Sequence, residues 1–390
     1  MKKYFSLTLI VLIFFWCNSF GQEQTGPEPQ VSQSVHNDTS PPLTELVNMQ
    51  TPPSQWEDGI VPLLIDPPQF ADEYEYDPSV QRINGSNGIS IVVQNWQGIS
   101  ASGLAPPDPS GAVGPNHYME MVNSRFQIWN KIGTSLLGPS SLGTIWAGFP
   151  GPWSGSLNDG DPIVLYDEAA DRWFASEFSL PNFPNGPFYM LIAVSQTNDP
   201  TGSWHRYGFT FPNMPDYEKY GIWPDGYYMS ANSFSSGSLN FIGAAAVAFE
   251  RSEMLNGNPA QMVFFQNSSS TTWSLLPSDN DGAAPPAGAS NYCTQLRPPN
   301  GLDVFEFDVD WVTPGNSTFT GPTIIAASPY SSVNNIPQSG TGTLLDAQDG
   351  KAMNRLNYRN FGSHQAMVVC HTIDAGGSRA GMRWYELRNT

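Results

Sequence analysis

The chain has 390 residues, of which 39% are hydrophobic and only 13% are charged. Gly (36 residues), Pro (35) and aromatic residues (22 Phe, 15 Tyr, 12 Trp) are abundant. This composition argues against coiled coils and helical bundles, which need Ala, Glu, Lys and Leu, and against full disorder, which lacks aromatic residues. The net charge of −19 would repel phosphate backbones, so we expect no nucleic-acid partner. An all-β protein with many short strands fits best.

Residues 1–21 have the pattern of a secretory signal peptide. Two lysines precede an apolar run from Leu7 to Trp16, and small residues follow it. The run is shorter than the ~20 residues that cross a bilayer, so no transmembrane segment is expected. The bulky Trp16 before Cys17 favours simple secretion over a lipoprotein. We predict cleavage before Gln22 and a secreted, extracellular or cell-surface protein.

The rest of the chain divides into a linker and one domain. Residues 22–88 are acidic and Pro-rich, which predicts an extended, mostly disordered linker. The domain covers residues 89–390 and begins with a predicted strand at 89–96. Within it, residues 268–301 predict a long loop, and residues 251–257 predict a short helix with Gly at its end.

An internal repeat organises this domain. Residues 111–124, 162–179 and 220–234 each read as strand, turn, aromatic residue and second strand, and residues 367–388 form a looser fourth copy. The anchoring aromatics are Tyr118, Trp173, Tyr227 and, in the fourth copy, Trp384. The first three are 55 and 54 residues apart. A period near ~50 residues with hairpins is typical of β-propeller blades, which bury their faces by stacking. We predict a monomeric β-propeller with about five visible blades of a six- to eight-bladed ring and with long loops.

Several segments resemble a known family. They are DPSGAVGPNHYMEMVN (108–123), GDPIVLYDEAADRWFASEF (160–178), YGIWPDGYYMSAN (220–232), NSTFTGPT (316–323), NYRNFGSHQAMVV (357–369) and AGMRWYELR (380–388). Over about residues 95–388 the chain resembles secreted, propeller-like proteins common in the Bacteroidetes, some of which end in a type IX secretion sorting domain. The resemblance implies an extracellular propeller and no particular reaction. Family members continue past the last segment, so we expect this chain to be truncated at its C-terminus, and Cys370 stands where Asn is expected.

The main functional hypothesis is a binding module for a glycan or an extracellular protein. The first alternative is a polysaccharide lyase or glycoside hydrolase, and the second is a structural, secretion-associated domain. The lyase would use Tyr358, Arg359, His364 and His371 as catalytic groups, because Arg binds carboxylates and Tyr with His can serve as acid and base. Interblade pairing of the same residues is the competing interpretation.

Ligand binding is assigned to Arg355, to His117 and to a solvent-facing aromatic platform made by Trp146 and Trp153. Aromatic rings of this kind could stack on sugars, although blade packing also explains them.

Carboxylates form three further candidates. Residues 301–311 alternate, so Glu306, Asp308 and Asp310 share one strand face, which either is solvated or binds Ca²⁺ or performs glycosidase chemistry. Asp279 and Asp281 suggest a weak Ca²⁺ loop, with an ordinary turn as the alternative. Asp108, Asp161 and Asp216 each precede the first strand of a repeat, where they either cap backbone amides or line the mouth of the channel.

Cys293 and Cys370 are the only cysteines after the signal peptide. A disulfide between them and two separate thiols are both compatible with the sequence.

Overall fold

The computed structural model describes residues 26–49 and 93–389, apart from residues 102, 156, 334, 377 and 378. The predicted signal peptide, residues 50–88 of the predicted linker and the first part of the predicted strand at 89–96 lie outside the described residues. Residues 93–96 are not in a strand. Among the described residues, no helix is long and apolar enough to cross a membrane.

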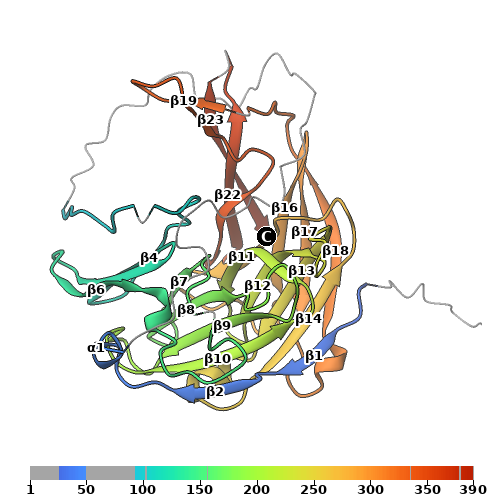
Figure 1. Cartoon of the computed structure of the whole chain (residues 1–390). Coiled ribbons are helices and arrows are strands. Elements are labelled where there is room, and N and C mark those ends of the chain that lie inside the picture. The colour runs from blue at the N-terminus through green and yellow to red at the C-terminus, as the bar shows by residue number, and fades with distance from the viewer. Residues whose placement is uncertain are drawn as a thin grey trace, which may run out of the picture.

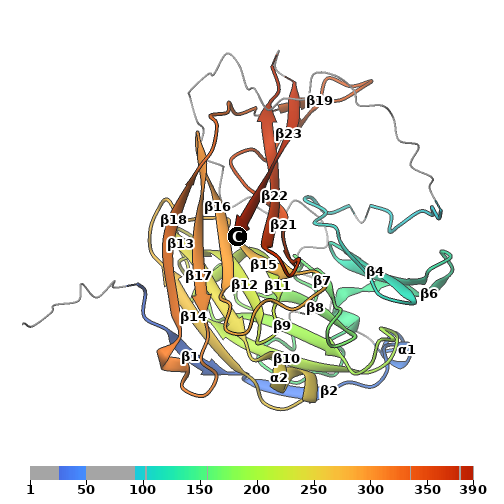
Figure 2. The same cartoon turned by 180° about the vertical axis from the view of Figure 1, so that it is seen from behind.

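The protein is an all-β propeller with five blades arranged around a centre (Figures 1 and 2). Blade 1 comprises β3 (Ser110–Val113), β4 (His117–Val122), β5 (Arg125–Asn130) and β6 (Ser135–Ser141). Blade 2 comprises β7 (Ile163–Asp167), β8 (Arg172–Ser179), β9 (Phe188–Ser195) and β10 (Trp204–Phe211). Blade 3 comprises β11 (Met214–Ile222), β12 (Tyr227–Phe234), β13 (Phe241–Phe249) and β14 (Gln261–Asn267).

The last two blades form one continuous sheet. Blade 4 comprises β15 (Leu276–Asn280), β16 (Asn291–Arg297), β17 (Gly301–Asp308) and β18 (Thr318–Ala326). Blade 5 comprises β21 (Met353–Asn360), β22 (Gln365–Asp374) and β23 (Ala380–Asn389). β15 and β21 pair in parallel, whereas neighbouring strands within each blade pair antiparallel. A small hairpin, β19 (Asn335–Pro337) and β20 (Leu344–Asp346), lies between the two blades in sequence.

Helical structure is sparse, as expected. The described elements are α1 (Leu43–Leu46), α2 (Arg251–Asn256) and two short 3-10 turns, Leu142–Thr144 and Pro314–Asn316. The predicted helix at 251–257 is confirmed: Gly257 follows α2 with φ of 73°, a left-handed conformation that Gly adopts at low cost.

The three strong repeat copies are the inner hairpins of blades 1, 2 and 3. Tyr118, Trp173 and Tyr227 stand at or next to the start of the second strand in their blades. The looser fourth copy is out of phase, because it covers β22 and β23, the second and third strands of blade 5, and its Trp384 is exposed. The five visible blades are confirmed; a larger ring stays a prediction.

Hydrophobic clusters fill the spaces between successive blades, which explains the aromatic-rich composition. One cluster joins blades 2 and 3 through residues such as Phe174, Phe209 and Phe249, and others join blades 1 and 2, 3 and 4, and 4 and 5. Burying one such side chain contributes about 1.5–3 kcal/mol, so stacked blades stabilise each other where a single sheet would leave a face in water.

The linker prediction is wrong for the described part of residues 22–88. β1 (Gln30–Gln33) pairs with β14 and β2 (His36–Thr39) pairs with β10, so this segment adds an outer fifth strand to blades 3 and 2. We call residues 30–46, which include α1, the N-terminal strap. Its Leu43 and Leu46 are buried in the cluster between blades 1 and 2. The acidic, Pro-rich composition gave no sign of two strands whose partners, β14 and β10, are distant in sequence.

The loop predicted at 268–301 is also wrong in part, since it contains all of β15 and β16. β15 is short and leaves β16 after two residues to pair with β21, so the strand lacks the alternating pattern that a hairpin partner imposes.

Candidate functional site

A central pocket of about 690 Å³ lies where the innermost strands of the blades meet. β3, β7, β11, β15 and β21 all contribute residues at or near their ends. Six acidic side chains line it together with two basic ones; the acidic set is Asp108, Asp161, Glu168, Glu218, Asp279 and Asp281, and the basic set is Lys219 and Arg355.

The three recurring aspartates converge on this pocket. Asp108 and Asp161 line it, and Asp216 directly precedes the lining residues of β11. Asp108 and Asp161 have φ angles of 39° and 48°, and Tyr217, next to Asp216, has φ of 57°. Non-glycine residues rarely adopt this left-handed region, and such strained conformations gather at functional sites. The interpretation of these aspartates as lining the channel mouth is supported.

Asp108 and Asp161 form a hydrogen-bonded carboxyl pair. The Asn123 amide holds both: its Nδ2 donates to Asp108 at 2.7 Å, and its Oδ1 accepts from the Asp161 backbone N–H at 2.9 Å. Burial raises the pKa of Asp161 strongly, with further increases from Asp108 and Asp216. The pKa of Asp108 is also raised by burial but is lowered in part by Lys219. Two adjacent buried carboxyls cannot both ionise easily, so this arrangement favours protonation of the pair.

Glu218 is the most deeply buried carboxyl of the pocket, with 1% exposure. The register of β11 against β12 shifts between Asp216 and Lys219, so a bulge changes where these side chains point. Neither carboxylate oxygen of Glu218 has a hydrogen-bond partner among the described residues. Burial, and then the charge of Asp161, raises the pKa of Glu218 well above its ordinary value. Burial therefore favours the protonated form of Glu218, whose carboxyl is not paired with another described residue.

Two lysines flank the ring of Tyr217. The Lys219 Nζ lies 3.8 Å and the Lys351 Nζ 4.4 Å from the ring centre. Burial is the largest influence on the pKa of Asp216, which is raised to about 6 although both lysines lower it. The same burial lowers the pKa of Lys351. Lys219 and Lys351 favour the ionised form of Asp216, but acidic side chains still outnumber basic ones in the pocket lining.

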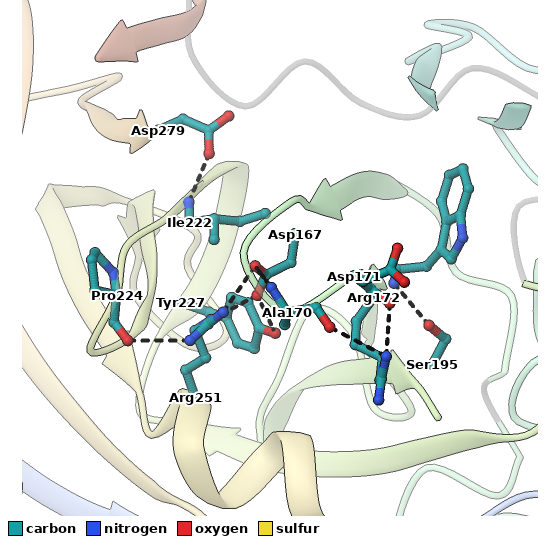
Figure 3. Close-up of polar contacts among 11 residues, drawn as sticks. Asp167, Ala170, Asp171, Arg172, Ser195, Ile222, Pro224, Tyr227, Arg251 and Asp279 are labelled. Carbon is teal, nitrogen blue, oxygen red and sulfur yellow. Dashed lines mark hydrogen bonds and ion pairs between the residues drawn. The ribbon is translucent and has the colours of Figure 1, made fainter. Parts of the chain in front are cut away.

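Arg355 forms the opposite wall and ion-pairs with two acids. Its Nε contacts Asp279, and its Nη2 donates to Asp281 at 2.8 Å. The Asn357 amide donates to Asp281 at 2.7 Å. Asp279 accepts the Ile222 backbone N–H at 2.8 Å, as Figure 3 shows. Burial raises the pKa of Asp279 to about 6 in spite of Arg355.

Asp279 and Asp281 therefore pair with the Arg355 guanidinium and do not form the weak Ca²⁺ loop that the sequence suggested. Asp279 lies in β15 and not in a turn. Among the described residues, no group of three or more His, Cys, Asp and Glu side chains is arranged to hold a metal ion. Arg355 does line the pocket, as its assignment to ligand binding requires.

A separate ion-pair network joins blades 2 and 3 beside the pocket (Figure 3). Asp167 is fully buried at the end of β7 and receives two hydrogen bonds from Arg251, at 2.6 and 2.9 Å, and one from the Tyr227 hydroxyl at 3.0 Å. Because every partner is satisfied, this network is structural.

The four residues predicted to be catalytic face different surroundings. Tyr358 is buried and donates to Gln365, with its ring 4.7 Å from that of Trp223. Arg359 is exposed, and its guanidinium lies 5.8 Å from the Phe361 ring.

The two histidines lie at opposite ends of blade 5. His364 stacks on Phe361 in the turn before β22, whereas His371 is buried near the far end of β22 and contacts the Tyr385 hydroxyl at 3.0 Å. None of the four predicted catalytic residues lines the central pocket. The contacts named above fit packing within blade 5, and only that of Tyr358 with Trp223 joins two blades.

The remaining predicted ligand residues do not form a platform. Trp146 and Trp153 have exposures of 1% and 0% and belong to the cluster between blades 1 and 2. His117 is half-buried and lies 3.8 Å from Asp199. The prediction of a solvent-facing aromatic platform is wrong, because both indoles are needed to fill an interblade core.

The structure also decides two other sequence predictions, the disulfide and the acidic strand face. Cys293 is buried and Cys370 half-buried, and both are free thiols, so the disulfide is not formed. On β17, Phe305 and Phe307 are buried while Glu306 and Asp308 are exposed, which makes the acidic face a solvated one. It lies outside the central pocket.

Sequence reasoning missed Asn123, Glu218, Lys219 and Lys351. Glu218 and Lys219 lie two and three residues after Asp216, so the recurring aspartate already marked their neighbourhood. Lys351 carried no signal, because it lies outside the repeat copies. Asn123 did carry one, since it stands five residues after Tyr118 as Asn232 stands five residues after Tyr227 in the third copy.

Comparison with known proteins gives fold-level similarity only. No family model and no curated protein sequence matches the chain. Among solved structures, a Bacillus halodurans C-125 xylan β-1,4-xylosidase is 10% identical with a TM-score of 0.36, over 73% of this chain and 53% of that one. This chain thus spans about half the length of that enzyme. A GH43 endo-arabinanase from Bacillus licheniformis is 12% identical with a TM-score of 0.29, over 72% and 93% of the two chains. An α-L-arabinofuranosidase from Lactobacillus brevis is 11% identical with a TM-score of 0.35, over 72% and 89%.

Proposed function

We propose that the central pocket hydrolyses glycosidic bonds of a neutral polysaccharide by carboxyl acid–base chemistry. The observation that carries this proposal is the set of buried carboxyls with raised pKa values, led by Glu218, whose two oxygens have no partner among the described residues. Glycoside hydrolysis needs one protonated and one ionised carboxyl on either side of the scissile bond.

Glu218 is the general acid. Its burial favours the protonated form, and its carboxyl is not paired with another described residue. Asp108 is the base, because Lys219 and Lys351 favour its ionised form and Asn123 orients it at 2.7 Å. Asp161 holds the proton shared with Asp108 and so prevents a second negative charge beside it.

The charge of the pocket supports a neutral substrate. With six acidic and two basic lining residues, it would repel uronic acids and sulfated glycans. Hydroxyl groups, in contrast, can donate to carboxylates and accept from protonated carboxyls and ammonium groups. This favours a hydrolase over the polyanion-cleaving lyase, whose proposed residues face elsewhere.

The test uses purified protein and a panel of neutral polysaccharides, with reducing ends as the readout. Glu218→Gln and Asp108→Asn should each lower kcat by about 10²-fold or more, because general acid and base catalysis each contribute on that scale. Glu306→Gln is the matched control, since this exposed carboxyl on β17 lies outside the pocket. Unchanged activity in both pocket variants would overturn the assignment.

Binding of a glycan to both wild-type and Glu218→Gln protein, with no release of reducing ends by either, would instead identify a recognition module at the same pocket. The glycan-binding hypothesis drawn from the sequence would then hold, and the hydrolytic one would not.

We also propose that the protein is exported by its N-terminal signal and acts outside the cell, as the propeller-like secreted family that it resembles would. Expression in a bacterial host with an intact secretion pathway should yield a mature chain that begins at Gln22. Recovery of uncleaved chain only, in the cytoplasm, would contradict this.

A further inference from the structure

A second, smaller pocket of about 330 Å³ lies beside the central one. It is lined by Gln94, Asn95, Trp96, Tyr118, Glu120 and Lys131, with Gly98 and Val113. Val113, at the end of β3, also lines the central pocket and is 57% exposed, so the two pockets meet across this single side chain. We call the smaller one the side pocket.

The side pocket has an aromatic wall fixed by the core of blade 1. The Trp96 ring lies against Gly133, where a Cβ atom would come within 2.9 Å of the indole. Trp96 meets Tyr118 edge-on with ring centres 6.1 Å apart, and Tyr118 lies 5.6 Å from the buried Trp129. The Trp96 and Tyr118 side chains themselves are only half-buried. Rigid, amphipathic rings of this kind present an apolar face to a ligand at low entropic cost.

Polar groups with remaining hydrogen-bonding capacity stand around these rings. The Glu120 carboxylate accepts from the Ile99 backbone N–H at 3.1 Å and from the Tyr118 hydroxyl at 3.3 Å. The Lys131 ammonium donates to the Gly114 carbonyl at 2.9 Å. A carboxylate offers about four acceptor sites and an ammonium three donors, so both retain capacity for a ligand. Their opposite charges balance, unlike the acidic excess of the central pocket.

We propose that the side pocket is a distal subsite that holds a neutral sugar ring of an oligosaccharide whose reacting bond lies in the central pocket. The apolar face of the sugar would stack on Trp96, and its hydroxyls would meet Glu120 and Lys131. This inference rests on the proposed function in that the same glycan chain occupies both pockets. It adds that the substrate is a chain longer than a disaccharide, because a ring must reach past Val113 to enter the side pocket.

Binding as a function of chain length tests this subsite separately from catalysis. The probes are disaccharides and hexasaccharides of the xylo-, arabino-, cello- and manno- series, measured by calorimetry with Glu218→Gln protein, which limits turnover. Trp96→Ala should weaken hexasaccharide binding by about tenfold and leave disaccharide binding unchanged, the loss expected for one aromatic contact. Trp96→Phe, which keeps a ring, should retain most of the affinity and shows whether Trp96→Ala acts through the lost ring or through loss of folding.

Trp384→Ala is the matched control, because Trp384 is a 65% exposed tryptophan on blade 5 that lines neither pocket. It should change neither affinity. Equal losses for both chain lengths in Trp96→Ala, no loss for either, or no binding of any hexasaccharide by the parent protein would overturn the subsite. Length-dependent binding that needs Trp96, without hydrolysis by the wild type, would keep the subsite and refute the hydrolytic proposal.

Discussion

Asp108 and Asp161 come from the starts of two different blades and yet share a hydrogen bond across the central pocket. Asn123 fixes both through opposite ends of one amide, at 2.7 and 2.9 Å. The pair lies where the innermost strands of blades 1 and 2 meet, and burial raises the pKa of both carboxyls.

The buried carboxyls should make the protein more stable in mild acid than at neutral pH. Burial raises the pKa values of Asp216 and Asp279 from 3.8 to about 6, so the folded state binds protons that the unfolded chain releases. Stability is therefore greatest below the unfolded pKa and falls as pH rises from about 4 through about 6. Urea melts from pH 4.5 to 7.5 should show a decline on the order of 2 kcal/mol. Asp216→Asn should flatten this decline and Glu306→Gln should not; stability that rises over this range would contradict the burial of these groups.

Removing Arg355 should destabilise the fold. Asp279, 4% exposed, would lose the guanidinium that contacts it and would be left as a buried, uncompensated acid. We expect Arg355→Met to cost about 3 kcal/mol in the free energy of unfolding. The double variant Arg355→Met, Asp279→Asn should recover most of this loss in denaturant titrations. Equal instability of the single and double variants would mean that the ion pair is not the cause.

The N-terminal strap should contribute to stability through one buried ion pair. Arg206 of β10 is 2% exposed and forms a two-pronged contact with Asp38 of β2, at 2.7 and 2.8 Å. Asp38→Asn leaves a buried guanidinium underpaired and should cost about 2–3 kcal/mol.

Asp199→Asn is the matched control for the strap. Asp199 is 53% exposed, and its ion pair with His117 is long, at 3.8 Å. It should change stability by less than about 1 kcal/mol. Similar melting temperatures for the two variants would show that the Asp38–Arg206 ion pair does not stabilise the fold.

The two free thiols should leave the protein insensitive to reducing agents. Because Cys293 and Cys370 are not bonded, dithiothreitol should not change the melting temperature. Burial raises the pKa of Cys293 to about 12, so a thiol reagent should label it only after unfolding. Loss of stability on reduction, or rapid labelling of Cys293 in the native protein, would contradict this arrangement.

Part of the site could be predicted from the sequence. The recurrence of Asp108, Asp161 and Asp216 before each repeat follows from the blade architecture, because equivalent positions of successive blades face the same axis. The four predicted catalytic residues misled, although their neighbour Arg355 does line the pocket; the four are Tyr358, Arg359, His364 and His371. Residues that are close in sequence along a strand point to opposite faces and lie at different points along its length. The tryptophans at 146 and 153 misled because composition does not show which aromatic residues fill an interblade core.

The sequence alone determined the all-β class, the inner hairpins of blades 1–3 and the acids that stand before them, since these depend on local period and turn residues. The tertiary structure decided which acids meet, that a bulge in β11 brings Glu218 into the pocket wall, and that Asp279 and Asp281 face Arg355. The physical reason is that burial and charge proximity set the pKa values and partners of these groups. Both arise from strands that are far apart in the chain and adjacent only after the blades have closed around the pocket.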